Sequence, residues 1–595
     1  MLETLALAAN HAGWSSRRRT VTGRLQPVDS FAVAAANPCS CQPPATAPTR
    51  GPALEIAAPS ALAALIFFFN LWRYGLWEPD EARYAEIARE MVSGGSLLIP
   101  HLNYVIYVEK PPLLYWLTSL SFAIFGTNEF AARLLVALFG VIGVAVTSWF
   151  AARCLGRRHA LLAGGILATM PLYATMAQVL TTDVMLTTFV TIANFALFLH
   201  WREGGRWCWL GYCAIALGVL TKGPVAIILP LAAMLAFLIW ERDWRGWIAR
   251  FRVLGGLGLV VLISAPWFIA LAVRVPGYLD FYFVGEHLRR AFETSYSHGE
   301  PFYFYVPVLL AGLLPWSLLM PFLTWRRLEP NPARRFCVAA AVTTGAVFSG
   351  ASAKLIPYIL PAVPPIAILI ADGIISCAWP SRAHGRAVPP PDSRILAESG
   401  PLLGILGAVA IAAAIFAPQF GSPYPGSVQR ALLGVGAVLV AGGALVTALL
   451  LGRQTVAGLT ALVLTMGLAL MGASWARIEA EPLRSYAVLA REVARQAPDA
   501  TVICYHRYVQ ALPFYTRKRV VLVGARTELG FGSKLAPEAG QYFLRNDADL
   551  LGLWQAPGKK VLVLDEADLA RLKERLGAFR VIGAEFHKRA IEKPR

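Results

Sequence analysis

Charged residues are scarce in this sequence, and that scarcity excludes an ordinary soluble protein. Only 15% of the 595 residues are charged, whereas 56% are hydrophobic. Soluble domains carry about 25% charged and about 45–50% apolar residues. Many apolar runs of about 20 residues are each long enough to cross roughly 30 Å of hydrocarbon. The sequence therefore predicts a polytopic α-helical membrane protein.

Three further absences narrow the class. Of eight cysteines, only Cys504 lies beyond the last apolar run, so no disulfide framework is expected there. The chain has no glycine-rich dinucleotide fingerprint, and residues 480–595 contain no nucleophile elbow. Its first 50 residues, rich in Ala, Pro, Ser and Thr, lack the order of a signal peptide. We expect residues 1–52 to form a disordered cytoplasmic tail.

The apolar runs predict about 13 transmembrane helices within a membrane domain of residues 53–476. The break at Thr221-Lys222-Gly223-Pro224 leaves open whether the flanking runs form one broken helix or two. The expected cores are 57–76, 131–152, 160–178, 184–201, 207–221, 223–240, 253–274, 304–324, 336–352, 355–375, 402–418, 431–452 and 455–474.

Basic residues in alternate loops predict the orientation. The net charge of +18 is concentrated in short loops between apolar runs, so it indicates membrane topology rather than nucleic-acid binding. The positive-inside rule places these loops and the N-terminus in the cytoplasm and the C-terminus outside. The loops carry Arg153/Arg157/Arg158, Arg202/Arg206, Arg242/Arg245/Arg250/Arg252, Arg326/Arg327/Arg334/Arg335, Arg382/Arg386/Arg394 and Arg453.

Residues 477–595 are more polar, and they predict a small periplasmic α/β domain. We expect helices at 485–496 and 565–576 and strands at 501–505, 520–523 and 560–564. No catalytic motif is evident in this domain, so a packing or substrate-facing role is favoured over independent catalysis.

The first outer loop, residues 77–129, is unusually rich in charge. Glu78-Pro79-Asp80-Glu81 is typical of a helix start, because proline and acids favour the first turn. The helix should end at Gly94-Gly95, and a second short helix should run from Pro111-Pro112 to Leu117. Asp80, Arg83 and Tyr84 then share one face of the first helix. Helix capping is the alternative role for these acids.

Other ionisable residues fall on the same outer side. They lie in Thr181-Thr182-Asp183, Thr221-Lys222-Gly223-Pro224, Glu286-His287-Leu288-Arg289-Arg290 and Ser352-Ala353-Lys354. Ionisable groups at membrane depth are costly, and they are candidates for function by default. Acids and bases therefore converge on one side of the predicted bundle.

These motifs resemble those of a known family. Glu78-Pro-Asp80-Glu81-x-Arg83-Tyr84, Glu109-Lys110-Pro-Pro, Thr-Thr-Asp183, Thr-Lys222-Gly-Pro and Lys354-x-x-x-Tyr358 look like the bacterial lipid A aminoarabinose transferases. These belong to a superfamily of GT-C membrane glycosyltransferases that includes the protein O-mannosyltransferases. The resemblance runs from about Leu65 to the end, with Tyr508–Tyr515 and Phe531-Gly532 among its features.

The resemblance implies a reaction. A monomeric enzyme of the bacterial inner membrane would move 4-amino-4-deoxy-L-arabinose from undecaprenyl phosphate to a lipid A phosphate on the periplasmic face. The modified lipopolysaccharide would favour resistance to polymyxin and other cationic peptides. No nucleic acid and no obligatory cofactor are expected. Another sugar, a protein or other lipid acceptor, and a transporter or flippase remain alternatives; a transporter site would lie nearer the bilayer midplane.

The same resemblance suggests roles for the candidate residues. Asp80 would be the catalytic base, with Glu109 and Asp183 positioning sugar or acceptor. Cations would meet the charge of the lipid phosphate. His287 and Glu109 are candidate ligands of a divalent metal, with a simple hydrogen bond as the alternative. The candidate cations are Arg83, Lys110, Lys222, Arg289, Arg290 and Lys354, and Tyr84, Tyr107 and Tyr358 would line the sugar or lipid pocket.

Overall fold

The computed structural model describes most of the chain after the N-terminal region. The expected tail at residues 1–52 lies outside the described residues, as does Arg290. The described ranges are 53–94, 96–289, 300–322, 331–379, 381–383, 386–388, 394–416, 426–525 and 527–593.

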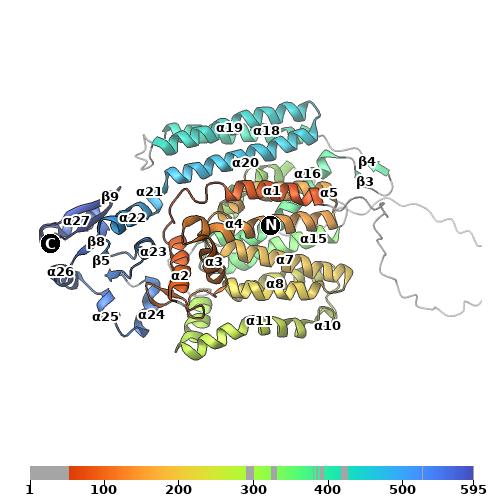
Figure 1. Cartoon of the computed structure of the whole chain (residues 1–595). Helices are drawn as coiled ribbons and strands as arrows, with labels where there is room; N and C mark the ends of the chain where they lie inside the picture. The colour runs from red at the N-terminus through yellow and green to blue at the C-terminus, as the bar shows by residue number, and fades with distance from the viewer. Residues whose placement is uncertain are drawn as a thin grey trace, which may run out of the picture. The chain divides into compact units, whose positions relative to one another are not determined.

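A bundle of apolar helices forms the larger part of the structure (Figure 1). Within the described residues, seven helical segments are long and apolar enough to cross a membrane, and four apolar helices are shorter. The seven are α4 (Glu129–Cys154), α7 (Thr182–Glu203), α11 (Val253–Arg274), η4 with α16 (Ile356–Ala378), α18 (Ser399–Phe416), α19 (Gly426–Leu451) and α20 (Thr455–Glu479). The shorter four are α1 (Ala53–Phe68), α3 (Leu113–Phe125), α8 (Trp207–Lys222) and α9 (Val225–Trp240).

Helices occur at each of the expected cores, but several cores are interrupted. The core at 160–178 divides into α5 (Arg157–Thr169) and α6 (Pro171–Met176). Proline has no backbone N–H, so it starts a helix more readily than it continues one. The remaining cores give α13 (Tyr305–Gly312), α14 (Trp316–Leu319), η2 (Met320–Phe322), α15 (Pro332–Gly350), η4 (Ile356–Ala362) and α16 (Val363–Ala378). The number of membrane crossings stays a prediction.

The open question at Gly223-Pro224 has a clear answer. Two separate helices, α8 and α9, meet there, and Gly223 has a φ of 99°. That left-handed backbone suits glycine, which has no Cβ. The connecting elements are α10 (Trp247–Arg250), the π-helical η1 (Asp280–Arg289), β3 (Ser381–Ala383), β4 (Arg386–Val388) and α17 (Arg394–Ala397).

The described parts of the basic loops gather at one end of the bundle, as the charge pattern predicts. Arg153 of α4 pairs with Glu203 of α7 at 2.6 Å, and Arg335 of α15 pairs with Glu241 after α9 at 2.9 Å. These ion pairs connect loops that are far apart in the sequence. We call this the basic end, and we call the opposite end, next to α2 and α3, the site end.

The first loop folds at the site end. The predicted first helix is confirmed as α2 (Asp80–Gly94), and it is followed by a hairpin of β1 (His101–Leu102) and β2 (Val105–Ile106). The second helix, α3, was expected to end at Leu117 but continues to Phe125. No residue between these positions breaks a helix, and Gly126, with a φ of 77°, ends it.

The C-terminal region contains a six-stranded sheet in the order β7-β6-β5-β8-β10-β9. The first four are parallel neighbours, and β10 and β9 extend the sheet antiparallel. The three predicted strands match β5 (Thr501–Tyr505), β6 (Val521–Val523) and β8 (Lys560–Asp565). The others are β7 (Phe543–Leu544), β9 (Arg580–Glu585) and β10 (Lys588–Glu592).

Both predicted C-terminal helices are present among several short ones. The helix expected at 485–496 is α22 (Ala487–Gln496), and the one expected at 565–576 is α27 (Glu566–Leu576). The further helices are α21 (Glu481–Arg484), α23 (Ala511–Thr516), η6 (Thr527–Leu529), α24 (Gly530–Leu535), α25 (Ala539–Tyr542) and α26 (Asp547–Gln555).

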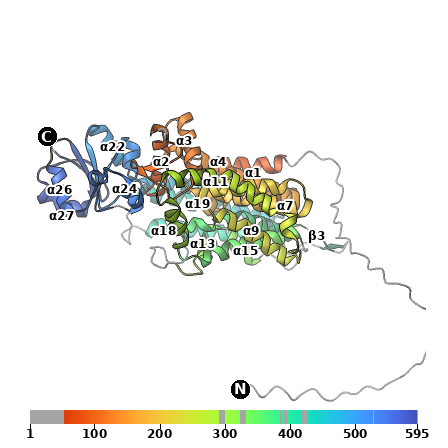
Figure 2. The ribbon, with the colours of Figure 1, turned by 90° about the horizontal axis from the view of Figure 1, so that it is seen from below.

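The C-terminal region packs on the first loop (Figures 1 and 2). The side chain of Asn103 in the β1–β2 turn exchanges two hydrogen bonds, of 2.8 and 3.0 Å, with the backbone of Val520. Gly532 lies so close to Ile106 that a Cβ at this glycine would be 2.0 Å from the Ile106 carbonyl oxygen. The Phe531-Gly532 feature of the sequence is therefore a packing requirement of this junction.

A buried ion pair joins the bundle to the first loop. Arg133 of α4 is fully buried, and its guanidinium donates two hydrogen bonds, of 2.8 and 2.7 Å, to Glu81 of α2. It also donates to the carbonyl oxygens of Leu71, Tyr74 and Gly75 in the turn after α1. Each N–H donor of the Arg133 guanidinium thus has an acceptor. A buried charge is tolerated when it is paired and hydrogen-bonded in this way.

Glu81 completes the junction from its side. Its carboxylate also accepts backbone hydrogen bonds from Trp77 and Leu180, at 3.0 and 2.9 Å. Burial alone would raise the pKa of Glu81, but the charge and hydrogen bonds of Arg133 and the two N–H groups lower it below its ordinary value. The pair therefore fixes the start of α2 against the residues that precede α7.

Glu81→Gln should destabilise the fold strongly, because the variant leaves the Arg133 charge buried without a counter-charge. Breaking a buried pair costs about 3–5 kcal/mol. Thermal unfolding in detergent should show the loss, whereas Glu492→Gln, which breaks the exposed pair with Arg495, should change little. An unaltered unfolding temperature for Glu81→Gln would contradict the assigned role.

The pH dependence of the wild type follows from the lowered pKa of Glu81. The stabilising contribution of Glu81 is present above its unfolded pKa, about 4.3, and is lost as the pH falls through the lower folded value. This acid-side loss should be absent in Glu81→Gln.

Candidate active site

Four chain segments bring predicted acids and bases together at the site end. Asp80, Arg83 and Tyr84 lie in the first turns of α2, and Tyr107 and Glu109 follow strand β2. Two helices of the bundle provide the other two residues. Asp183 lies in the first turn of α7, and Lys222 is the last residue of α8. These positions suit the helix dipoles, since acids are favoured at helix starts and bases at helix ends.

Asp183 and Lys222 form a direct ion pair. The ammonium of Lys222 lies 2.5 Å from the Asp183 carboxylate, and both side chains are mostly buried. The same ammonium lies 4.2 Å from the ring centroid of Tyr358, in η4. Lys222 therefore has a carboxylate on one side and an aromatic face on another, a setting that holds a cation at one position.

Asp80 is the most exposed carboxylate of the group. Its side chain is 53% exposed and contacts Arg83 at 3.3 Å. Loss of hydration around the carboxyl group raises the pKa of Asp80, and Asp183 raises it further. Arg83, Lys110 and Lys222 act in the opposite direction, without cancelling the rise. Arg83, Lys110, Lys222 and Asp183 thus all lie within electrostatic reach of Asp80.

Three neutral tyrosines, Tyr84, Tyr107 and Tyr115, lie near Glu109. The hydroxyl of Tyr107 donates to the Glu109 carboxylate at 3.0 Å. Burial raises the pKa values of Tyr107 and Tyr84, so both stay protonated hydrogen-bond donors at neutral pH. The ring of Tyr115, in α3, packs on Tyr84, with centroids 5.9 Å apart. Its buried hydroxyl has no hydrogen-bond partner among the described residues, so it can meet a bound sugar or lipid.

Arg83 is held by the C-terminal region, which the sequence pattern did not reveal. Its guanidinium donates to the Gln510 side chain at 3.2 Å and pairs with Glu528 at 3.3 Å. The amide of Gln510 also donates to Glu528, so the two form one unit. Arg83 therefore has Asp80 on one side and this unit on the other, and the C-terminal region takes part in building the site.

Glu78 fastens the same junction. Its carboxylate accepts the backbone N–H groups of Gln510 and Ala511, at 3.2 and 2.7 Å, at the start of α23. Burial raises the pKa of Glu78 to about 7, against the lowering effects of these hydrogen bonds and of Arg507 and Arg83. The approach of α23 to α2 is thus set by backbone contacts as well as by the Arg83 partners.

Other predicted residues are placed differently or are not described. The ammonium of Lys354 donates to the carbonyl oxygens of Glu300 and Ala351, at 2.9 and 2.6 Å, and the residue is 5% exposed. Its predicted role as a phosphate ligand stays a prediction. The side chains of His287 and Arg289 and the whole of Arg290 lie outside the described residues.

The metal hypothesis is likewise left open by the described residues. They contain no group of three or more His, Cys, Asp or Glu side chains suited to a metal ion. The hypothesis pairs Glu109 with His287, whose side chain is not described.

Comparison with known proteins identifies the family. Residues 109–269 match the family model described as dolichyl-phosphate-mannose-protein mannosyltransferase, and residues 489–593 match the aminoarabinose transferase C-terminal domain. A protein of Aeromonas hydrophila named undecaprenyl phosphate-alpha-4-amino-4-deoxy-L-arabinose arabinosyl transferase is 31% identical over 69% of this chain and 76% of its own length. The chain belongs to this aminoarabinose transferase family.

Further relatives agree. A protein of the same name from Aeromonas salmonicida is 32% identical over 68% of this chain and 74% of its own length. The match to the Erwinia tasmaniensis protein, at 34% identity, spans 54% of this chain and 59% of that protein. The predicted family and enzyme class, a glycosyltransferase, are confirmed, and the transporter alternative is set aside.

Solved structures support the fold as well. The crystal structure of ArnT from Cupriavidus metallidurans bound to undecaprenyl phosphate has a TM-score of 0.79 and 26% identity, covering 91% of this chain and 98% of that one. The apo form of the same protein gives a TM-score of 0.78 at 25% identity. The predicted GT-C type of multi-pass membrane fold is therefore confirmed.

Glu528→Gln should lower turnover without unfolding the protein. The substitution keeps the shape of the side chain but removes the charge that holds Arg83, and a hydrogen bond to a charged group contributes about 1.5–3 kcal/mol. A roughly tenfold fall in kcat is expected, because about 1.4 kcal/mol corresponds to a factor of ten.

The control is Glu538→Gln, which removes an exposed partner of Arg519 at 2.8 Å in the same region. It should leave kcat unchanged. If Glu528→Gln instead lowers the unfolding temperature and leaves kcat intact, Glu528 serves packing and not the positioning of Arg83.

Proposed function

We propose that this enzyme transfers 4-amino-4-deoxy-L-arabinose from undecaprenyl phosphate to a phosphate group of lipid A, at the site end of the bundle. One observation carries the proposal: Arg83, Lys110, Lys222 and Asp183 all lie within electrostatic reach of Asp80, where membrane helices meet an outer loop. The names of the relatives, and the undecaprenyl phosphate bound to ArnT in its crystal structure, support the donor.

Orientation and location form part of the proposal. The basic end carries the arginine-rich loops, so the positive-inside rule puts it in the cytoplasm. The site end then faces the periplasm, where lipid-linked donor and lipid acceptor both reach the site from the bilayer. We place the enzyme in the bacterial inner membrane, where such transfer would modify lipopolysaccharide and favour resistance to cationic peptides.

The cations suit the charge that the reaction develops. When the bond between the sugar carbon and the carrier oxygen breaks, the leaving group is undecaprenyl phosphate, and its new negative charge needs fixed positive groups. Removing one such contact typically costs roughly 10²–10³ in rate. Lys110, Lys222 and Arg83 are the residues of this cluster that supply positive charge. Arg83 can bind a phosphate bidentately, whereas a lysine acts as a point charge.

The carboxylates fit the acceptor and the sugar. A lipid A phosphate is already anionic near neutral pH, since a phosphate loses its second proton near pH 6, so its attacking oxygen needs little help from a base. Asp80, Asp183 and Glu109 then orient substrate groups, and they suit an amino sugar because a protonated amine is a cation. If the acceptor were a hydroxyl instead, Asp80 would take its proton.

Asp80→Asn should abolish transfer while the protein still folds, because the substitution keeps size and removes charge at a partly exposed position. Mass spectrometry of lipid A from cells with the wild type, with no gene and with the variant measures the added sugar. Glu109→Gln and Asp183→Asn should lose transfer less completely.

Asp499→Asn, at an exposed position outside the cluster, is the matched control and should modify lipid A normally. Normal lipid A modification by Asp80→Asn at normal expression would show that Asp80 is only a helix cap. A wild-type gene that adds a different sugar, or none, would contradict the proposed donor or acceptor.

Lys110→Ala should weaken binding of the carrier lipid and reduce turnover severely, with membrane insertion unchanged. Pro111 and Pro112 stiffen the backbone after Lys110, which suits a cation held at a fixed depth. Affinity of the purified protein for undecaprenyl phosphate is the measurement, and Lys573→Ala, at an exposed position of α27, is the control. If Lys110→Ala has unchanged affinity and turnover, Lys110 does not bind the carrier phosphate and only contacts lipid headgroups.

A further inference from the structure

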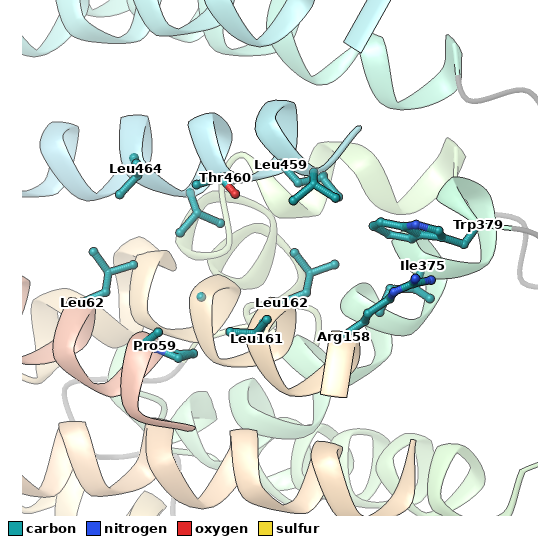
Figure 3. Close-up of a pocket in the computed structure, with 14 residues that line it drawn as sticks. Pro59, Leu62, Arg158, Leu161, Leu162, Ile375, Trp379, Leu459, Thr460 and Leu464 are labelled. Carbon is teal, nitrogen blue, oxygen red and sulfur yellow. The ribbon is translucent and has the colours of Figure 1, made fainter. Parts of the chain in front are cut away.

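A cavity lies at the basic end, far along the bundle from the carboxylate site. It has a volume of about 350 Å³ and is lined by residues of α1, α5 and α20 and by Ile375 and Trp379 at the end of α16 (Figure 3). Apart from Arg158 and Thr460, every residue that lines it is apolar. A water molecule needs two to four polar partners, so this lining favours an apolar chain over water.

The cavity is reached from the side of the bundle. Leu162 and Leu459 are buried at its floor, whereas Leu161 and Leu464, which also line it, are 43% and 51% exposed. Leu459 and Leu464 belong to α20, a helix long and apolar enough to cross the membrane. Exposed leucines on such helices face hydrocarbon, so the cavity communicates with one leaflet of the bilayer.

A single cation stands at one end of this apolar space. Arg158, in the first turn of α5, lies with its guanidinium carbon 5.0 Å from the ring centroid of Trp379 (Figure 3). No carboxylate pairs with Arg158 within the described part of the chain. The adjacent Arg157 differs, since it pairs with Glu55 at 3.3 Å. Arg158 therefore has an aromatic contact, and its N–H groups can donate hydrogen bonds to an anion.

We propose that this cavity binds a glycerophospholipid with an anionic headgroup, with an acyl chain in the apolar space and the lipid phosphate at Arg158. Basic pockets between transmembrane helices are known to select anionic headgroups on the side of the membrane that carries the basic loops. The cavity, its single cation and its position at the basic end all fit that chemistry.

The position also indicates what the lipid does. Among α18, α19 and α20, the helix that packs on α1 and α5 is α20, and the cavity lies along this contact. A lipid bound there fills the seam between that layer of helices and the remainder of the bundle (Figure 1). The lipid is thus a structural ligand, distinct from the carrier and acceptor lipids of the reaction.

Photolabelling tests the proposal. The full-length protein is reconstituted in phosphatidylcholine vesicles with a trace of phosphatidylglycerol that carries a diazirine on an acyl chain. After irradiation, mass spectrometry should find the label on peptides of α5 and α20 that include Leu161 and Leu464. Arg158→Gln should reduce this labelling about fivefold, because one basic residue near anionic lipid contributes about that factor.

Two further variants keep the test decisive. Arg206→Gln removes an exposed arginine at the same end of the bundle, outside the cavity, and should label like the wild type. Gly165→Leu fills the cavity from the α5 side, next to Val463, and should also reduce labelling. Both Arg158→Gln and Gly165→Leu should keep sugar transfer, which confirms folding.

Several outcomes would overturn the inference. Equal labelling by phosphatidylcholine carrying the same diazirine would remove the role of charge, and label spread evenly over all membrane helices would leave only an ordinary lipid belt. Unchanged labelling of Arg158→Gln would exclude the phosphate contact. Increased labelling after deletion of residues 1–50 would assign the cavity to that segment. Loss of label to added undecaprenyl phosphate would assign it to the carrier.

Discussion

The buried pair of Arg133 and Glu81 is the constraint on which the site depends. Arg133 belongs to a bundle helix, and its five donors bind Glu81 and three carbonyl oxygens of the turn after α1. Glu81 in turn accepts the backbone N–H of Leu180, just before α7. The first turns of α2 and α7 carry Asp80 and Asp183, so one ion pair sets the spacing between two carboxylates of the site. Its desolvation is compensated only because each polar atom has a partner.

The C-terminal region also holds residues of the candidate site in place. Arg83 has one side on Asp80 and the other on Gln510 and Glu528, which lie more than 400 residues further along the chain. Asn103 and Gly532 fix the same junction through backbone contacts. The first outer loop thus lies between the helix bundle and the sheet of the C-terminal region, and contacts on both sides hold the guanidinium of Arg83.

Much of the fold could be predicted from the sequence, because hydropathy and loop charge act locally. The apolar runs coincide with helices, and the alternation of basic loops correctly placed Asp80, Asp183 and Lys222 at one end. The different roles of adjacent residues were harder to predict. Asp80 and Glu81 are both acids at a helix start, but successive helix positions point about 100° apart. One therefore faces the site and the other the buried arginine, a difference that requires knowledge of where Arg133 lies.

The other features that the sequence did not predict also depend on contacts or breaks that leave no local pattern. The partners of Arg83 depend on contacts across more than 400 residues, and no periodicity reports such contacts. Helix breaks such as the one at Met170-Pro171 leave the hydropathy of a run unchanged. Short strands such as β7, with two residues, carry no readable alternation. Tyr115 lay within a helix that the sequence predicted, yet only its unpartnered buried hydroxyl marks it as a site residue.

The most direct test of this account is a cryo-EM structure of the full chain with undecaprenyl phosphate bound. The account predicts density for the carrier phosphate at the site end, within contact distance of Lys110, Lys222 or Arg83, with the Arg133–Glu81 pair intact and Arg83 still on Glu528. A phosphate bound at the basic end, or one held at the site end by none of these three cations, would contradict it.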